Sequence, residues 1–456
     1  MADPRGFLKH ERQDRKKRPV EERVRDFKDL YKDLPETQLK EQAVRCMDCG
    51  VPFCQSPTGC PVQNLIPEWN DWVSQGRWED ALLALHSTNN FPEFTGKLCP
   101  APCESACVLA FTDKAVTIKD IEMSIIERGY AEGRVKPAPA FLRSGKSVAI
   151  IGSGPAGLAA AQQLARSGHS VTVYEKHDAI GGLLRYGIPD FKLEKWIIDR
   201  RLEQLSAAGV RFKTGCELGK DVTLEELKKT HDAVCLAIGA EKARDVPVPG
   251  RELPGVHLAM DYLMAQNRAN SGKAPLPDAM NAKGKRVVIL GGGDTGSDCL
   301  GTAHRQGCAG IHQFELLPRP PASRDASTPW PQWPLLLRSS HAHEEGGNRD
   351  WGVMTTAFVG DTQGVRALKA VRVKPGAKGF EPVAGSDFEI PCEMVLLAVG
   401  FTGPTMPITV DRDFMTQTEG VFAAGDATRG ASLIVWAIAD ARRMAAAVNR
   451  YLRRDT

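Results

Sequence analysis

Several features that would direct a chain to a membrane or to nucleic acid are missing from these 456 residues. No apolar run is long enough to span a bilayer. The first residues, MADPRGFLKHERQ, lack the apolar core of a secretory signal, so we expect a cytoplasmic location. A formal net charge of +3 is too small to indicate nucleic acid or an anionic membrane surface as a partner. The basic run at residues 12–18 is therefore expected to be a solvated arm.

Cysteine, in contrast, is abundant and unevenly distributed. Seven of the 12 cysteines lie within residues 46–107, and the other five are scattered. In a reducing compartment, dense cysteine indicates metal ligation before disulfides. No Cys-x-x-Cys-His sequence is present, so covalently attached haem is not indicated. Around these cysteines, helical patterns at 36–46 and 78–85 alternate with loops, and a proline-rich linker at 136–146 ends the segment.

A glycine-rich turn follows the β-branched segment 147–151 and has the spacing of a dinucleotide-binding fingerprint. The turn reads Gly152-Ser153-Gly154-Pro155-Ala156-Gly157. Gly154 would let the backbone approach a pyrophosphate, and the helix expected at 156–166 would point its N-terminus at the phosphates. A second strand at 170–174 ends at Glu175, an acid that can accept hydrogen bonds from both ribose hydroxyls.

Two further segments indicate that this first dinucleotide is FAD. The loop at 181–189 exposes backbone that could lie against a flat ring system. Its candidate contact residues are Gly182, Leu183 and Arg185. Far downstream, a strand in 420–426 is expected to end in Gly425 and Asp426, where the acid can bond the ribityl or phosphate-bearing chain. A helix at 432–447 would aim its N-terminus at the flavin ring.

A second turn with the same spacing follows the strand expected at 286–290. It reads Gly291-Gly292-Gly293-Asp294-Thr295-Gly296. The next strand, at 311–316, carries Glu315 near its end, which favours the free ribose hydroxyl of NADH. Arg319 could instead pair with the 2′-phosphate of NADPH. We expect NADH from Glu315 and keep NADPH as the alternative.

The clustered cysteines have spacings that suit iron–sulfur ligation. They run Cys46-x2-Cys49-x4-Cys54-x5-Cys60 and Cys99-x3-Cys103-x3-Cys107. Two 4Fe–4S clusters need four ligands each, so one ligand is not cysteine, and Glu122 is a candidate. Zinc and redox-inert buried thiols are alternatives, and Cys46-x2-Cys49 would fit a zinc knuckle. Zinc has no redox chemistry, however, whereas a flavin that receives a hydride needs single-electron carriers to reach a remote acceptor.

These units predict an α/β protein with two Rossmann-like dinucleotide-binding domains after a mainly helical iron–sulfur domain. We expect an iron–sulfur domain at 1–145, an FAD domain at 146–243 and 398–456, and an NAD(P)H domain at 244–397. No cysteine pair lies close to the flavin loop, and Cys299 and Cys308 do not form a Cys-x-x-Cys pair. A dithiol route for electrons out of the flavin is therefore not expected.

The motifs together resemble the small (β) subunit of glutamate synthase over nearly the whole chain. The segments that carry the resemblance are CMDCGVPFC at 46, NLIPEWN at 64, GKLCPAPCE at 96, GSGPAGLAAA at 152, GGLLRYGIPDFK at 181 and GGGDTG at 291. The same module resembles the electron-input half of dihydropyrimidine dehydrogenase and the flavin subunits of ferredoxin:NAD(P)H transhydrogenases. Two departures are the extra residues between Cys54 and Cys60 and the short segment 405–420.

The resemblance implies how the ligands are shared between two clusters. Cys46, Cys49, Cys54 and Cys107 would hold one 4Fe–4S cluster, and Cys60, Cys99, Cys103 and Glu122 would hold the other. In that family the small subunit oxidises NAD(P)H at FAD. Electrons then pass to a large (α) subunit, which makes L-glutamate from L-glutamine and 2-oxoglutarate.

We therefore expect an electron-input subunit in a hetero-oligomer, with no protein acid or base in the hydride transfer itself. One alternative is electron input to another oxidoreductase of the two related types. A different class of function is a regulatory module that binds dinucleotide and zinc without turnover. A visible spectrum of the purified protein would separate this last hypothesis from the others.

Overall fold

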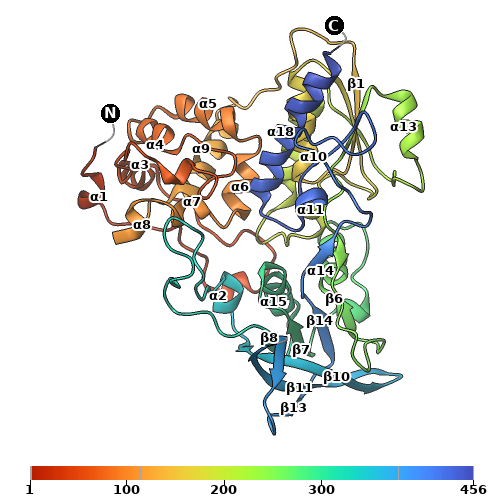
Figure 1. The fold of residues 1–456 in the computed structure, drawn as a ribbon. Helices are drawn as coiled ribbons and strands as arrows, with labels where there is room; N and C mark the ends of the chain where they lie inside the picture. The colour runs from red at the N-terminus through yellow and green to blue at the C-terminus, as the bar shows by residue number, and fades with distance from the viewer. Residues whose placement is uncertain (1–2, 113, 378, 455–456) are drawn as a thin grey trace.

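The computed structural model describes residues 3–112, 114–377 and 379–454 (Figure 1). Its N-terminal part is helical, as expected. The elements are α1 (Gly6–Lys9), α2 (Val20–Arg23), α3 (Glu36–Val44), η1 (Phe53–Gln55), α4 (Ile66–Ser74), α5 (Trp78–Thr88), α6 (Pro92–Leu98), α7 (Pro102–Ser105), α8 (Leu109–Thr112) and α9 (Ile118–Ala131). Helix α9 is held by an apolar stripe at helical spacing, because Ile118, Ile121, Ile125 and Ile126 are all buried.

The first sheet is parallel and has the strand order β16-β4-β1-β2-β3. Its strands are β1 (Ser147–Ile151), β2 (Ser170–Tyr174), β3 (Arg211–Lys213), β4 (Ala233–Leu236) and β16 (Val421–Ala423). Helices accompany it: α10 (Pro155–Arg166), α11 (Leu183–Tyr186), α12 (Lys195–Ala207), α13 (Leu224–Thr230), α17 (Asp426–Arg429) and α18 (Ile434–Leu452). Strand β16 joins the sheet from the far end of the sequence, so this doubly wound unit is interrupted by the next one.

The second parallel sheet has the order β6-β14-β7-β8-β9. Its elements are β6 (Val256–Leu258), α14 (Ala259–Asn270), η2 (Asp278–Met280), β7 (Arg286–Leu290), α15 (Asp294–Gln306), β8 (Gly310–Glu315), α16 (His341–Glu344), β9 (Asn348–Trp351) and β14 (Met394–Leu397). The short pair β5 (Lys242–Ala243) and β15 (Phe401–Gly403) lies where the chain enters and leaves this unit. The predicted fold class is confirmed.

An antiparallel ribbon that the sequence did not indicate is added to the second unit. It consists of β10 (Val353–Asp361), β11 (Gly364–Gly376), β12 (Gly379–Pro382) and β13 (Phe388–Pro391). Three residues of β11, Val365, Leu368 and Ala370, are buried in a core shared with β7 and β14. Figure 1 shows the ribbon at the edge of the molecule remote from the N-terminal helices.

The basic N-terminal run is not a solvated arm, and that expectation is wrong. Arg12 pairs with Glu104 of α7 at 2.8 Å, and Lys17 pairs with Glu344 of α16. Carboxylates on two other elements thus hold the run in place.

Just beyond this run, Arg23 forms a buried junction with the second unit. Its Nε donates to Glu345 at 2.7 Å, and Glu345 also accepts from Arg305 of α15 at 2.7 Å. The side chains of Glu345 and Arg305 are fully buried and that of Arg23 is 2% exposed. A second junction joins the helical part to the unit built on the first sheet, where Arg201 of α12 makes a bidentate pair with Glu93 of α6. In the described part of the chain, no helix is both long and apolar enough to cross a membrane.

Candidate functional site

The three glycines of the first turn have different structural roles. A Cβ on Gly152, whose φ is +98°, would lie 2.3 Å from the Ala237 carbonyl oxygen. A Cβ on Gly157 would lie 2.0 Å from the Gly152 carbonyl oxygen. At Gly154, no heavy atom of the described residues comes within 4 Å of the added carbon, apart from its immediate chain neighbours. Gly152 and Gly157 are therefore required by packing, whereas Gly154 keeps space open for a ligand.

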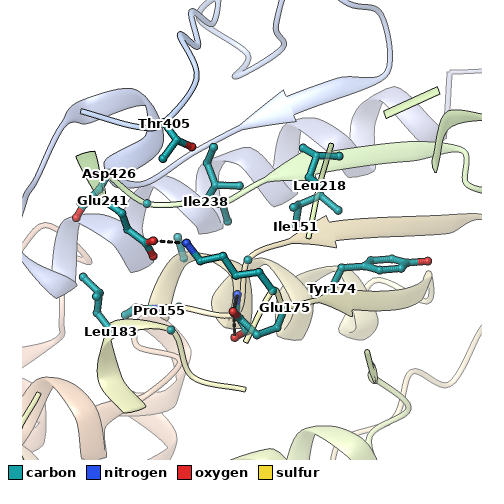
Figure 2. Close-up of a pocket in the computed structure, with 18 of the residues that line it drawn as sticks. Ile151, Pro155, Tyr174, Glu175, Leu183, Leu218, Ile238, Glu241, Thr405 and Asp426 are labelled. Carbon is teal, nitrogen blue, oxygen red and sulfur yellow. Dashed lines mark hydrogen bonds and ion pairs between the residues drawn. The ribbon is translucent and has the colours of Figure 1, made fainter. Parts of the chain in front are cut away.

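That open space is a cavity of about 240 Å³ between the ends of β1, β2 and β4 and the start of α18 (Figure 2). Asp426, Thr405 and Leu183 lie toward one end of it and Tyr174 and Leu218 toward the other. At its middle, Glu175 Oε2 accepts from the backbone N–H of Ser153 at 3.2 Å, and Oε1 accepts from His177 N–H at 2.9 Å. Glu175, the predicted acid, is thus held beside the backbone of the glycine-rich turn.

The other predicted contact residues of this site fall into two groups. Those that line the cavity are Gly152, Gly154, Pro155, Ala156, Glu175, Gly182, Leu183 and Asp426. Gly157, Arg185 and Gly425 are not among the residues that line the cavity. The Arg185 side chain instead donates to the Ile180 carbonyl oxygen and pairs with Asp199. The short segment 405–420 still reaches the site, because Thr405 and Met406 line it.

The second turn repeats the first in its geometry. A Cβ on Gly291 would lie 2.2 Å from the Ala398 carbonyl oxygen and one on Gly296 2.3 Å from the Gly291 carbonyl oxygen. At Gly293, again, no heavy atom of the described chain lies within 4 Å beyond its neighbours. Glu315 Oε2 accepts from the Gly292 N–H at 2.6 Å, as Glu175 does from Ser153. Helix α15 begins at Asp294, so this turn also presents a helix N-terminus.

Two arginines flank the indole of Trp351 beside Glu315. The guanidinium carbons of Arg319 and Arg349 lie 5.2 and 5.1 Å from the Trp351 ring centroid. Arg349 Nη1 donates to the Arg338 carbonyl oxygen at 3.0 Å, and neither Arg319 nor Arg349 forms an ion pair with a carboxylate among the described residues. Burial, together with the Arg319 charge, lowers the pKa of Arg349. The sequence did not single out Arg349, because only the pairing of β8 with β9 places residue 351 opposite Glu315.

The first group of cysteines surrounds a small cavity in the helical part. The cysteines that line it are Cys46, Cys49, Cys54 and Cys107. Cys54 is buried, Cys49 is exposed and the other two are half-buried. Burial raises the pKa of Cys46 to about 12. A neutral thiol is therefore favoured until a cation stabilises the thiolate.

The second group surrounds a separate small cavity. It contains Cys60, Cys99, Cys103 and Glu122. Glu122 Oε1 accepts from Asn89 Nδ2 at 2.9 Å and from the Thr95 hydroxyl, which fixes the carboxylate. Burial raises the pKa of Glu122 to about 7. Val435, in the first turn of α18, lines the same cavity.

The two donor sets fit iron–sulfur clusters. The grouping of seven cysteines and Glu122 by cavity is the same as the grouping that the resemblance implies. Each set gives four donors around one space, which is the ligand number of a 4Fe–4S cube. Within the described ranges, no three His, Cys, Asp or Glu side chains are arranged to hold a single metal ion.

Two family models match the chain in series. Residues 146–441 match "Pyridine nucleotide-disulphide oxidoreductase", and residues 23–134 match "Dihydroprymidine dehydrogenase domain II, 4Fe-4S cluster". The solved structure of Mycobacterium tuberculosis FprA in complex with NADPH superposes with a TM-score of 0.54 at 19% identity, covering 67% of this chain and 84% of that one. At this identity the superposition supports the fold alone.

Curated relatives match almost the whole length. The glutamate synthase [NADPH] small chain of Mycobacterium tuberculosis strain H37Rv is 54% identical, over 99% of this chain and 96% of the relative. The corresponding Bacillus subtilis protein is 44% identical over 99% of each chain. The glutamate synthase [NADH] of Saccharomyces cerevisiae is 42% identical over 98% of this chain, which covers 22% of that longer protein. The chain therefore belongs to the glutamate synthase small-chain family.

Proposed function

We propose that this chain is the electron-input subunit of a glutamate synthase. It oxidises NADPH at FAD and passes the electrons through two 4Fe–4S clusters to a large subunit, which forms L-glutamate from L-glutamine and 2-oxoglutarate. The observation that carries the proposal is the placement of helix α18. Its first turn contributes Val435 to the second cysteine cavity and Ala437 to the flavin cavity. The first turn of α18 therefore lines both the proposed flavin space, which would hold a two-electron carrier, and the second cysteine cavity, which would hold a one-electron carrier.

The protein's own groups supply binding and orientation. Glu175, held by Ser153 and His177, is positioned to bond a ribose, and the turn at Gly154 exposes backbone to a pyrophosphate. When bound, FAD supplies the hydride chemistry. Of the described cysteines, Cys216 alone lines the flavin cavity, so the site offers no dithiol pair.

The domain limits follow the two sheets. We propose that residues 1–145 hold the clusters, that 146–243 with 398–456 hold FAD, and that 244–397 bind the nicotinamide coenzyme. Strands β1 to β4 and β16 fall within the flavin limits, and β6 to β14 within the coenzyme limits.

NADPH is proposed as the coenzyme because two neighbouring guanidiniums, those of Arg319 and Arg349, have no carboxylate ion-pair partner among the described residues. Arg319 and Arg349 offer positive charge where a 2′-phosphate would leave the ribose, beside Glu315. This moves the preference away from NADH, which Glu315 alone suggested. R319Q and R349Q should each raise the KM for NADPH about tenfold, equal to 1.4 kcal/mol, and leave that for NADH within about twofold. E315Q is the matched control. If the wild type prefers NADH, or if the arginine variants weaken both coenzymes equally, NADPH is refuted.

The decisive test of the whole function uses the reconstituted complex. Purified protein should contain FAD and iron and show flavin and iron–sulfur absorption. With the large subunit, it should drive coenzyme-dependent glutamate formation from glutamine and 2-oxoglutarate. An iron-free, zinc-loaded complex that still passes electrons would contradict the cluster proposal. A holoprotein that reduces artificial acceptors but never supports glutamate formation would point to another oxidoreductase as partner.

A further inference from the structure

A long loop of the coenzyme-binding unit leaves that unit and contacts the iron–sulfur part. It is the segment 316–340, between β8 and α16, and is called the crossing loop below. Figure 1 shows it reaching the N-terminal helices near α7 and α8. Its first residues adjoin Glu315 and include Arg319, so the same segment begins beside the proposed 2′-phosphate position.

At its tip, Trp330 contacts the wall of the first cysteine cavity. The indole Nε1 donates to the carbonyl oxygen of Cys107 at 3.2 Å. The ring also lies edge-on to Phe53, with centroids 4.8 Å apart, and to Phe111, with centroids 5.9 Å apart. Phe53 lines that cavity and directly precedes Cys54. One side chain from another unit therefore touches the backbone of one cluster ligand and the neighbour of a second.

Arg324 holds the tip in place. Its Nη1 donates to the carbonyl oxygens of Thr328 and Gln332 at 3.0 and 2.7 Å, which closes the turn that carries Trp330. Its Nη2 donates to the Ser105 carbonyl oxygen at 3.3 Å, two residues before Cys107. The contact is thus made by two side chains of one turn. Arg324 donates to the carbonyl oxygen of Ser105, and Trp330 donates to that of Cys107.

We propose that Trp330 is a positioning residue for the first cluster, acting from the coenzyme-binding unit. The inference rests on the proposed function, since it presumes a cluster held by Cys46, Cys49, Cys54 and Cys107. The indole N–H orients the Cys107 ligand through its carbonyl group, and the rings of Trp330, Phe53 and Phe111 limit water access at that edge. Hydrogen bonds behind the ligands and solvent exposure both tune such clusters.

The sign of the effect follows from charge. A cube with four thiolate ligands becomes more negative on reduction, and water stabilises the more highly charged form. Removing the indole should therefore raise the reduction potential of the first cluster and expose it to attack. Removing the N–H while keeping a ring should disturb ligand orientation with little change in water access.

The test compares W330A and W330F with W333A in the anaerobically purified holoprotein. Trp333 lies in the same loop but stacks on Arg338, 4.0 Å away, so it controls for loop damage. In W330A we expect chelator-driven loss of iron to be about tenfold faster, a more positive potential and an altered electron paramagnetic resonance signal. W330F should change the signal with a smaller effect on iron loss. Flavin content and the rate of flavin reduction by NADPH should stay within about twofold of wild type, because the change is local to the cluster.

Two outcomes separate failure of this inference from failure of the function. Wild-type protein without iron or cluster signals would refute the cluster assignment itself. Wild-type protein with both clusters, but with W330A indistinguishable from W333A in iron loss, potential and signal, would overturn the role of Trp330.

Discussion

A substitution at Gly154 is expected to weaken FAD binding without weakening the fold. Gly154 lines the flavin cavity, and a Cβ added there meets no described protein atom within 4 Å beyond its neighbours, whereas one added to Gly157 would lie 2.0 Å from the Gly152 carbonyl oxygen. Forcing extra methyl groups into a closely fitted site costs about 1–3 kcal/mol, which is a factor of about 5 to 150 in Kd. Gly154→Val should therefore fold but lose most of its FAD.

The assay has two readouts. FAD per chain is measured after denaturation, and FAD affinity is measured by titrating apoprotein. Gly154→Ala should show a smaller loss of affinity than Gly154→Val, with a normal unfolding midpoint for both apoproteins. Gly157→Ala is the contrasting variant, because the backbone clash should lower the unfolding midpoint of the apoprotein itself. Stoichiometric FAD with wild-type affinity in Gly154→Val would refute the assignment of this turn to the pyrophosphate.

Three other predictions concern a cluster ligand, a buried ion pair and two buried histidines. Cys49→Ala should lose one cluster's iron and slow electron transfer to the large subunit, while stopped-flow reduction of FAD by NADPH stays normal; equal iron in variant and wild type would contradict this. Glu345→Ala should cost about 3–5 kcal/mol of unfolding free energy, because it leaves the buried cation of Arg305 without its carboxylate; Glu381→Ala, on the exposed ribbon, should change little. Burial lowers the pKa of His86 to about 3 and of His343 to about 4. The unfolded chain takes up these protons near pH 6.5 and the folded chain does not, so these two histidines should lower stability as the pH falls from about 6.5 to 4, whereas Glu122, whose pKa is raised by burial, acts in the opposite direction; a fall of the urea midpoint over this range that is the same in wild type, H86Q and H343Q would contradict the role of the histidines.

The sequence was sufficient wherever local pattern determines the backbone. Both glycine turns, the strands that precede them and the acids at Glu175 and Glu315 lie where the fingerprint spacing predicts. Helix ends were less well determined: the helix expected at 36–46 ends at Val44, and the one expected at 78–85 continues to Thr88. Neither departure affects the site.

What the sequence could not provide depends on contacts between distant segments. Arg349 lies 34 positions after Glu315, and only the parallel pairing of two strands brings the residues together. The N-terminal basic run was expected in solvent because its acidic partners, Glu104 and Glu344, are far away in the sequence. The antiparallel ribbon was missed since its strands alternate weakly and no glycine fingerprint marks them.

The interrupted first sheet also sets the order in which the protein can be completed during synthesis. Strand β16, Asp426 and the start of α18 all lie in the last 36 residues, and Ala424, Asp426 and Ala437 from this region line the flavin cavity. Chains fold largely from the N-terminus as they are made. The helical part can therefore gather all seven clustered cysteines while the coenzyme-binding unit is still being translated. The flavin cavity, in contrast, gains its last lining residues only when the chain has been made as far as Ala437. Of the proposed cofactors, FAD is in this respect the one whose site is completed last along the sequence.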